Sequence, residues 1–413
     1  MKIAVISDLH LGMRQYGLHE REEDFYNQFF KVIDNIIVCK PDLVIIGGDI
    51  FDKPRPSPKA LRVFSSGLTK LMQNDIDVVN IMGNHTMVKQ DGFITADEFF
   101  DGIINTPKKY TLLDIDNHYS NQDVEVFGLP YHYDSELDVF IKKVNDLNEK
   151  SINTKTNILV VHQAFSEFCG FAGVDLSIND ICIDNFDLII CGHIHERKVY
   201  QIDKKTSFLQ PGSIERLNIA EARDEETQGK GFYLLDTNTL DVDTISNGFV
   251  GVRNDRKFFI ADMYMGENDS VDDVKKEILD GIVDCNIPPI VFLTVHDTSQ
   301  SFSKLVDMTQ DLNKECLTVR LKYFDESKKE YDIITDASEL PTSEQALKIA
   351  LNPMNKDEAR FGLDLYRELK DGKDVQKLLD DFYKKNFIND VKPDPVLYTD
   401  EEIRELEDYF NNL

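Results

Sequence analysis

Residues 1–12 read MKIAVISDLHLG, a stretch in which an apolar run stops abruptly at two metal-capable side chains. The run from Ile3 to Ile6 is typical of a buried strand bounded by a loop. Parallel strands of an α/β sheet present ligand-binding residues at their carboxyl ends, which is where Asp8 and His10 stand. Because these two residues alternate with Leu9, a continuing strand would point both side chains the same way. A carboxylate and an imidazole aimed at one point form half of a metal site.

Later apolar runs end in the same kind of residue. Strands are predicted over residues 42–46, 77–82, 157–161 and 186–191. They alternate at first with helices predicted over 19–39 and 59–73, which is typical of a doubly wound or layered α/β domain. Residues 207–209 and 231–235 are predicted to close this domain as an antiparallel pair. The strand ends carry Asp49, Asp52, Asn84, His85, His162, His193 and His195.

Each of these residues, taken alone, is better explained without a metal. A lone His after a strand is more often a hydrogen-bonded loop residue, and Asp49 alone would serve as a cap. Their joint occurrence is different, because the carboxyl ends of the strands of one parallel sheet share an edge. Chance convergence of so many metal-capable side chains is improbable, so the pattern predicts a metal centre at that edge.

The types of ligand narrow the choice of metal. Carboxylate, imidazole and amide oxygen without thiolate suit Mn, Fe or Zn rather than a structural zinc site. Two ions about 3.5–4 Å apart bind a phosphate and activate a water, and the set is large enough for two. One carboxylate must then reach both ions, and Asp49 is the best candidate. Flanking glycines allow sharp turns and close approach of substrate: Gly47, Gly48, Gly83 and Gly192.

Composition sets the broad class of the protein. At 413 residues and 41% hydrophobic content, the chain is expected to fold into two or three domains. No apolar run approaches the roughly 20 residues of a membrane helix, and the N-terminus enters a strand at once, leaving no room for a signal peptide. The 6 Cys form no CxxC pair, as in a reduced cytosolic protein. A cytoplasmic protein without membrane contact is therefore expected.

The formal net charge is −29, which argues against binding nucleic acid through an extended basic surface. This charge is compatible with metal ions that bridge protein carboxylates to phosphates. It equally fits a salty cytoplasm or an acidic surface kept away from the active site. The sequence does not choose among these three explanations.

Further regions follow a metal-bearing domain assigned to residues 1–250. Residues 253–325 alternate strand, helix, strand, helix and strand, a βαβαβ unit large enough to fold alone. Polar residues 326–343 are interpreted as a linker, and 344–413 are predicted to be helical and amphipathic. Helices this short cannot bury their apolar faces alone, so they pack either on each other or on a partner.

The set D-x-H, GD-x-x-D, GNH, H and GHIH resembles the signature of the calcineurin-like metallophosphoesterases. Within that superfamily, the whole chain is similar to the archaeal form of the Mre-eleven (meiotic recombination eleven, SbcD-like) DNA-repair nucleases. The stretches that carry this likeness are SDLHLGMRQYGLHEREEDF, GGDIFDKPRPSPKAL, ILVVHQ, CGHIH, PGSIER and GKGFYLLD. The resemblance implies a layered, sandwich-type α/β phosphoesterase domain, a small α+β capping domain and C-terminal helices that dock a Rad-fifty-type ATPase.

The activity implied by the resemblance is that of a Mn-dependent DNA nuclease. Such an enzyme is a 3′-to-5′ exonuclease and single-strand endonuclease that processes double-strand-break ends together with the ATPase. Two Mn²⁺ per chain would activate the attacking water, with Mg, Fe or Zn as alternatives, in a nucleoid-associated cytoplasmic setting. A homodimer is also implied, for which two amphipathic helices supply Leu61, Leu68, Leu71, Met72, Phe93, Ile94, Phe99 and Ile103. The same residues would otherwise pack on the protein's own sheet.

Carried over residue by residue, the family pattern gives two ligand sets that share Asp49. The ligands of one ion would be Asp8, His10, Asp49 and His195, and those of the other Asp49, Asn84, His162 and His193. His85 matches the catalytic histidine, but Thr86 stands where many members have Asp, which leaves the orientation of His85 open. Residues expected to contact or position substrate are Arg14, Tyr16, Asp52, Arg55, Ser213 and Arg216. For Arg14, Tyr16 and Arg55 an alternative is equally good: they are solvated loop residues that do not contact the substrate.

Two other functions fit parts of the pattern. Another hydrolase, such as a phosphatase, nucleotidase or cyclic-nucleotide phosphodiesterase, would use the same ligands, but a small substrate needs neither the cap nor the helical tail. A non-catalytic scaffold that recruits an ATPase has no reason to keep two metal sites. Cleavage polarity, end preference, the physiological metal and the way the ATPase gates access do not follow from the sequence.

Overall fold

The computed structural model describes residues 1–87, 94–103, 110–151, 155–169, 174–223, 229–265, 270–297, 302–325 and 330–332. The chain divides into two units, Met1–Thr335 and Asp336–Leu413, and the described residues all belong to the first. The helices predicted over 344–413 and most of the linker predicted over 326–343 therefore lie outside the described residues. All that follows concerns the first unit.

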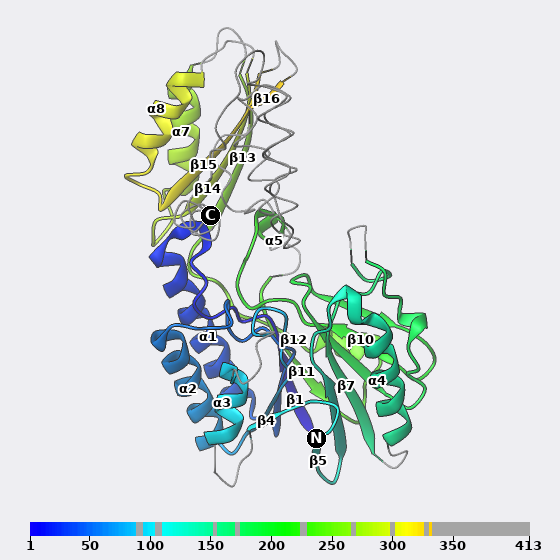
Figure 1. Ribbon diagram of the computed structural model, residues 1–413. Helices are drawn as coiled ribbons and strands as arrows, with labels where there is room; N and C mark the ends of the chain where they lie inside the picture. The colour runs from blue at the N-terminus through cyan, green and yellow to red at the C-terminus, as the bar shows by residue number, and fades with distance from the viewer. Residues whose placement is uncertain are drawn as a thin grey trace, which may run out of the picture. The chain divides into compact units, whose positions relative to one another are not determined.

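Two six-stranded sheets form the larger part of this unit (Figure 1). The first sheet has the order β12 (Phe249–Gly251), β11 (Gly231–Asp236), β1 (Lys2–Ile6), β2 (Leu43–Ile46), β3 (Asp77–Asn80) and β4 (Tyr110–Leu112). The second has the order β5 (Tyr119–Ser120), β6 (Val124–Leu129), β7 (Thr156–His162), β8 (Leu188–Gly192), β10 (Ser207–Gln210) and β9 (Lys198–Gln201). Strands β1 to β4 are parallel to one another, as are β6, β7, β8 and β10.

Alternate residues of the central strands enter different cores. On β1, Ile3 and Val5 belong to the apolar cluster between the two sheets, whereas Ala4 and Ile6 pack under the helices. Burial on both faces explains why these strands are continuous apolar runs rather than alternating ones. The result is a four-layer α/β sandwich, which confirms the predicted fold class.

Helices cover the outer faces of both sheets. The first sheet is covered by α1 (His19–Cys39), α2 (Pro58–Gln73) and α3 (Ala96–Ile103), and the second by α4 (Leu137–Lys150). Helix α2 begins at Pro58 because the Ser57 side chain accepts a hydrogen bond from the Ala60 amide, and proline is favoured in the first turn. Its apolar face, including Phe64 and Leu68, is then buried against the sheet.

One predicted pairing is wrong. Strand β10 pairs with β8 and β9 in the second sheet, whereas β11 pairs with β1 and β12 in the first. Both segments are apolar, as expected of paired strands. No tight turn connects them, however, and each pairs within a different sheet. The short helices α5 (Ile219–Arg223) and α6 (Val242–Asn247) complete this part of the unit, with single 3₁₀ turns at Gln15–Gly17, Asp134–Glu136 and Ile178–Asp180.

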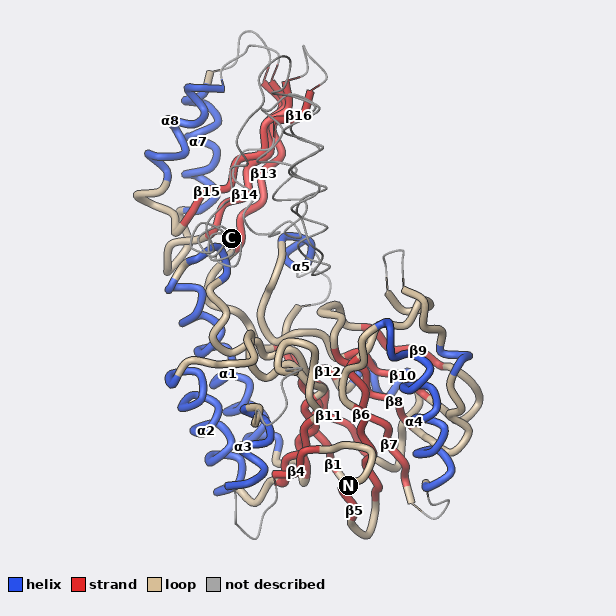
Figure 2. The backbone as a smooth tube through the Cα atoms, in the orientation of Figure 1, coloured by secondary structure: helices blue, strands red, loops and turns tan. Residues whose placement is uncertain are grey.

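A third sheet follows in the chain, as Figure 2 shows. Its order is β13 (Phe258–Met265), β14 (Ile290–Asp297), β15 (Thr318–Asp325) and β16 (Glu330–Asp332), with β16 antiparallel to β15. Helices α7 (Val271–Ile282) and α8 (Phe302–Leu312) cover one face. These elements alternate as the sequence predicted, while their independence as a capping domain stays a prediction. None of the helices in the described part of the chain is long and apolar enough to cross a membrane.

Candidate metal centre

The predicted ligands meet where the carboxyl ends of the first two sheets come together. Asp8 and His10 follow β1, Asp49 follows β2, and Asn84 follows β3, all in the first sheet. His162 is the last residue of β7, and His193 and His195 follow β8, both in the second sheet. The expectation that one parallel sheet presents all of them was wrong: two packed sheets share the site.

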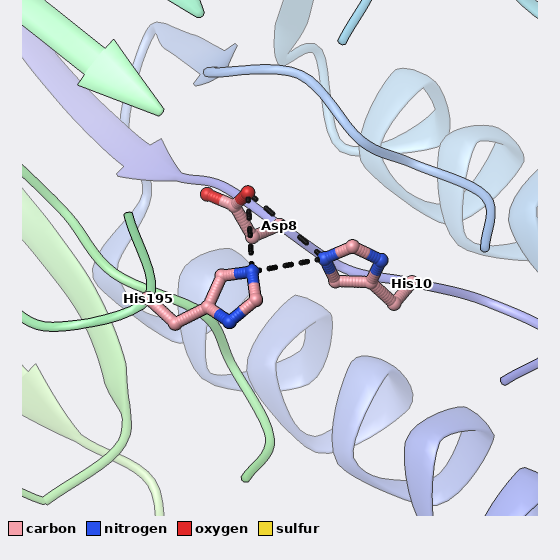
Figure 3. Close-up of side chains that lie close together, drawn as sticks. All are labelled: Asp8, His10 and His195. Carbon is pink, nitrogen blue, oxygen red and sulfur yellow. Dashed lines mark hydrogen bonds and ion pairs between the residues drawn. The ribbon is translucent and has the colours of Figure 1, made fainter. Parts of the chain in front are cut away.

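The first donor group consists of Asp8, His10 and His195 (Figure 3). His10 Nε2 lies 3.3 Å from His195 Nε2. Asp8 Oδ1 lies 4.0 Å from the His10 nitrogen and 3.9 Å from the His195 nitrogen. Asp8 and His10 are fully buried, whereas the His195 side chain is 25% exposed, so the group is open to solvent on the side of His195.

The second donor group consists of Asp49, Asn84, His162 and His193. His162 Nε2 lies 3.1 Å from Asp49 Oδ2 and 3.1 Å from Asn84 Oδ1. His193 Nδ1 lies 2.9 Å from the same Asn84 oxygen. Single ligand atoms of Asp8, Asp49 and His162 also lie within 4.8 Å of one another, so the two groups adjoin at the carboxylates of Asp8 and Asp49.

The ligand loops leave the strands in left-handed backbone conformations. Asp8 has φ 52°, His10 φ 43°, Asp49 φ 47° and His193 φ 82°. Strand β1 ends at Ile6, so Asp8 and His10 do not continue the strand as expected. A sharp turn brings their side chains together instead. The Asp8 amide donates to the Gly48 carbonyl at 3.1 Å and the His10 amide to the Asp49 carbonyl at 3.0 Å, which couples the two ligand loops.

Glycine packing and one backbone contact position His162. A Cβ on Gly48, whose φ is +105°, would lie 2.3 Å from His162 Nδ1, so no larger residue fits there. His162 Nδ1 lies 2.7 Å from the Gly47 carbonyl oxygen, so this nitrogen donates its proton there. Nε2 then presents a lone pair toward Asp49 and Asn84, as in a metal-ligating histidine.

The donor set fits divalent ions. Atoms bound to one ion at about 2.1 Å lie roughly 3.0 to 3.4 Å apart in octahedral or tetrahedral geometry. The closest donor pairs, at 2.9 to 3.3 Å, match this spacing. Without a proton or a cation between them, the His10 and His195 nitrogens would face each other lone pair to lone pair. Histidines, carboxylates and an amide oxygen are ligands that such ions accept.

Electrostatics in the buried centre favour neutral imidazoles at two positions. Burial lowers the pKa of His10 well below its usual value and that of His193 to about 3. At His162, burial also acts to lower the pKa, but the charge and hydrogen bond of Asp49 raise it to about 9. Burial raises the pKa of Asp8, whereas at Asp49 it is outweighed by His162, which holds the pKa low. Asp49 and His162 therefore stabilise each other's charged forms when no metal is bound.

His85 stands beside the first group. Its Nδ1 lies 2.8 Å from the Asp52 carbonyl oxygen, its ring centroid lies 4.7 Å from that of His10, and its amide donates to Asp49 Oδ1 at 3.0 Å. The orientation of His85 is therefore set by the backbone of Asp52. Thr86 is buried and contacts the Gly83 carbonyl oxygen through Oγ1 at 3.3 Å.

The residues expected to contact substrate are dispersed. Asp52 offers a ligand atom within 4.8 Å of ligand atoms of His10 and His85, and Ser213 donates its amide to the His195 carbonyl at 3.2 Å. The other four residues have contacts elsewhere or lie in an exposed loop. Tyr16 packs against Phe292 of β14, Arg14 is exposed and paired with Glu22 at 2.6 Å, Arg55 lies in an exposed loop, and Arg216 is buried and donates to the Arg256 carbonyl.

Residues that the sequence did not single out support the ligands. Ser7 Oγ donates to Asp8 Oδ2 at 2.6 Å, and Glu221 Oε1 lies 3.4 Å from His195 Nδ1. Glu221 is itself paired with Lys230 at 2.6 Å. Burial acts against ionisation of Glu221, but Lys230 and His195 lower its pKa to about 2. Lys230 falls within the GKGFYLLD stretch, whereas nothing in the local pattern marks Glu221.

Comparison with known proteins agrees with this geometry. Residues 1–197 match the family model described as calcineurin-like phosphoesterase. The DNA double-strand break repair protein Mre11 of Methanococcus maripaludis is 29% identical over 397 residues, which cover 94% of this chain and 100% of that protein. The protein of the same name from Methanocaldococcus jannaschii is 27% identical over 398 residues, covering 94% and 100%, and that of Saccharolobus solfataricus is 26% identical over 392 residues, covering 92% and 98%. Residues 1–197 are therefore similar to the calcineurin-like phosphoesterases, and the chain is similar over more than nine-tenths of its length to archaeal Mre11 proteins.

Proposed function

We propose that the chain is a two-metal DNA nuclease that hydrolyses phosphodiester bonds at double-strand breaks. The observation that carries this proposal is the pair of donor groups that adjoin at Asp8 and Asp49, with His85 beside them. The names of the Mre11 relatives, DNA double-strand break repair proteins, support DNA as the substrate. Activity as a 3′-to-5′ exonuclease and single-strand endonuclease belongs to the same proposal.

Under this proposal each donor group holds one ion, with Mn²⁺ as the proposed metal and Mg, Fe or Zn as alternatives. The ligands of one ion are Asp8, His10, Asp49 and His195, and those of the other Asp49, Asn84, His162 and His193. When bound, the two ions supply Lewis-acid polarisation of the phosphate and an activated water. The chain fixes the ligands beforehand: Ser7 orients Asp8, and the Gly47 carbonyl orients His162.

His85 is proposed to act on the leaving oxygen. Its Nδ1 donates to the Asp52 carbonyl, which leaves Nε2 as the nitrogen available to substrate. A protonated Nε2 donates a proton or a hydrogen bond to the oxygen that departs from phosphorus. Because the His85 amide also contacts Asp49, the proton donor and the shared ligand are positioned by one loop.

The test is the His85→Ala variant, assayed on single-stranded and blunt duplex DNA in Mn²⁺, with metal content measured by mass spectrometry. Cleavage is expected to fall about 10² to 10⁴-fold, while two ions per chain remain, because general acid catalysis is lost without loss of a ligand. His118→Ala, an exposed histidine outside the centre, serves as the matched control. A falling metal count would contradict the role of His85. Hydrolysis of small phosphate esters by the unaltered protein without DNA cleavage would contradict DNA as the substrate.

Assembly as a homodimer is a further part of the proposal. Ile94 and Phe99, beside and on α3, are 70% and 48% exposed, which suits a two-fold helical interface. Leu68 and Leu71 of the same predicted interface are buried in the protein's own core, and Phe93 lies outside the described residues. Light scattering that shows a monomer at micromolar concentration would contradict the homodimer.

The Rad-fifty-type ATPase is proposed to dock on the helices predicted over 344–413, outside the described residues. Amphipathic helices too short to be stable alone suit binding to a partner. Co-elution with the ATPase should therefore be lost when that segment is removed. Co-elution that persists after its removal would contradict this docking site.

A further inference from the structure

A buried ion pair lies directly behind His195. Glu221 on α5 and Lys230, just before β11, are 5% and 6% exposed, and Lys230 Nζ lies 2.6 Å from Glu221 Oε2. Neither residue belongs to either donor group. Burial of two charges is unfavourable even when they are paired, so a pair in this position calls for a reason beyond stability.

Both members of the pair contact His195. Glu221 Oε1 lies 3.4 Å from His195 Nδ1, and Lys230 Nζ donates to the His195 carbonyl oxygen at 3.2 Å. Ser213 joins the group, because its hydroxyl accepts from Lys230 at 2.7 Å and lies 3.2 Å from Glu221 Oε2. The ring and the backbone of one ligand are therefore contacted by the same ion pair.

Further hydrogen bonds fix Glu221 itself. Its carboxylate accepts the Leu217 amide at 3.2 Å and the Asn218 side-chain amide at 2.8 Å, and its own amide donates to Asn218 Oδ1 at 2.9 Å. A carboxylate with this many donors has little freedom to rotate. It therefore fixes the imidazole that donates to it.

The direction of this contact decides what His195 offers on its other side. When Nδ1 donates its proton to Glu221, the Nε2 lone pair faces His10 Nε2 at 3.3 Å and Asp8 Oδ1 at 3.9 Å. The other tautomer would place a proton between the two imidazoles. The second donor group contains no such ion pair among the described residues, since His162 uses the Gly47 carbonyl for the same purpose.

We propose that the Glu221–Lys230 pair is a positioning device for His195, which sets the affinity of the first donor group for its ion without contacting the ion. The inference rests on the proposed two-metal function and extends it to two residues outside the ligand set. Glu221 selects the tautomer and orientation of the ring. Lys230 holds the backbone of His195 and balances the buried charge of Glu221.

The test compares Glu221→Gln with the double variant Glu221→Gln/Lys230→Met, using calorimetric Mn²⁺ titration and thermal melting without metal. The single variant is expected to melt at a lower temperature, because Lys230 is left buried without its carboxylate. The double variant removes both charges at similar volume, so its metal-free melting temperature is expected to return toward that of the unaltered protein. One of the two Mn²⁺ sites of the double variant is expected to bind about 10- to 100-fold more weakly, because the neutral amide is a poorer orienting acceptor.

A matched control removes an ion pair away from the centre. Lys155 lies 3.3 Å from Glu125, and their side chains are 23% and 5% exposed. Lys155→Met/Glu125→Gln is expected to leave both Mn²⁺ affinities unchanged. If the Glu221/Lys230 double variant also bound both ions as tightly as the unaltered protein, the positioning role would be overturned. An unaltered protein that binds two ions but cleaves no DNA would contradict the proposed function, while the loss of affinity in the double variant would still support the positioning role.

Discussion

The two donor groups are built from the same kinds of ligand but are supported in different ways. In the first group, His195 is oriented by a side-chain carboxylate, which belongs to a buried ion pair. In the second, His162 is oriented by the Gly47 carbonyl and by close packing of Gly48. The first group should therefore respond to changes of charge, and the second to added volume. Under the proposed function Asp49 is shared by both groups, so a change there should remove the distinction between them.

The largest effect is expected for Asp49→Asn. This change removes the charge of the shared ligand, so both ions should be lost together and DNA cleavage should fall by at least about 10³-fold. Metal content per chain, measured after dialysis against micromolar Mn²⁺, checks the result. Asp123→Asn, an exposed aspartate in a turn of the second sheet, is the control. Loss of one ion alone would show that Asp49 is not shared.

A smaller and more selective effect is expected for Gly48→Ala. The added Cβ would lie 2.3 Å from His162 Nδ1, so the ligand must move. Displacement of one ligand should weaken Mn²⁺ binding at the second group about 10²-fold and leave the first group less affected, as measured by calorimetric titration.

Gly17→Ala provides the matched control, because Gly17 also has a positive φ of +71° but an added Cβ meets nothing within 4 Å. Both variants place a Cβ at a residue with positive φ, which is unfavourable for the backbone. Only in Gly48→Ala does the added Cβ also collide with His162. Equal loss of affinity at the two groups in Gly48→Ala would remove the contrast between them.

The smallest effect on metal binding is expected for Asp97→Asn. Asp97 is fully buried under the loop that carries Asn84, and its Oδ1 accepts from Asn80 at 2.6 Å. Burial, with the nearby charge of Asp49, raises the pKa of Asp97 from 3.8 to about 7 despite hydrogen bonds from Asn80 and Thr86. The unfolded chain loses this proton near pH 4 and the folded protein near pH 7. The favourable contribution of Asp97 to the free energy of unfolding is therefore fully present below about pH 4 and is lost as the pH rises to 7.

The amide that replaces Asp97 cannot ionise. As the pH rises from 5.5 to 8, the free energy of unfolding of the variant should therefore increase relative to that of the unaltered protein. The expected gain is on the order of 1–3 kcal/mol, measured by urea denaturation of both proteins at the two pH values. Both ions should remain bound. A stability difference that is the same at the two pH values would show that Asp97 does not keep its proton in the folded protein.

Local pattern was sufficient to predict the central strands and the metal-capable side chains that follow them, but not the short strands β4, β5, β9, β12 and β16. Each ligand follows an apolar run closely, and burial on both faces makes that run visible in the sequence. The helix at 19–39 was predicted with the bounds that the structure gives it. Its apolar residues recur at helical spacing, and α1 stops at Lys40, which has φ 51°.

Features that depend on distant parts of the chain could not be predicted. The turn that brings Asp8 to His10 is left-handed and follows from hydrogen bonds to Gly48 and Asp49 in another loop. The division of ligands between two sheets depends on strand pairing across long separations. Glu221 and Lys230 carry ordinary surface side chains, and only the packing of α5 behind His195 turns them into a buried pair.

The left-handed conformations of Asp8, His10, Asp49 and His193 have an evolutionary consequence. A residue with a Cβ in this region costs roughly 1 kcal/mol relative to glycine, so four such positions burden a marginally stable chain. In a lineage freed from catalysis, drift toward Gly or Asn at these positions would be stabilising rather than neutral. The backbone strain at these four positions is therefore held in place by the surrounding fold, as is usual where a site is built before its ligand arrives.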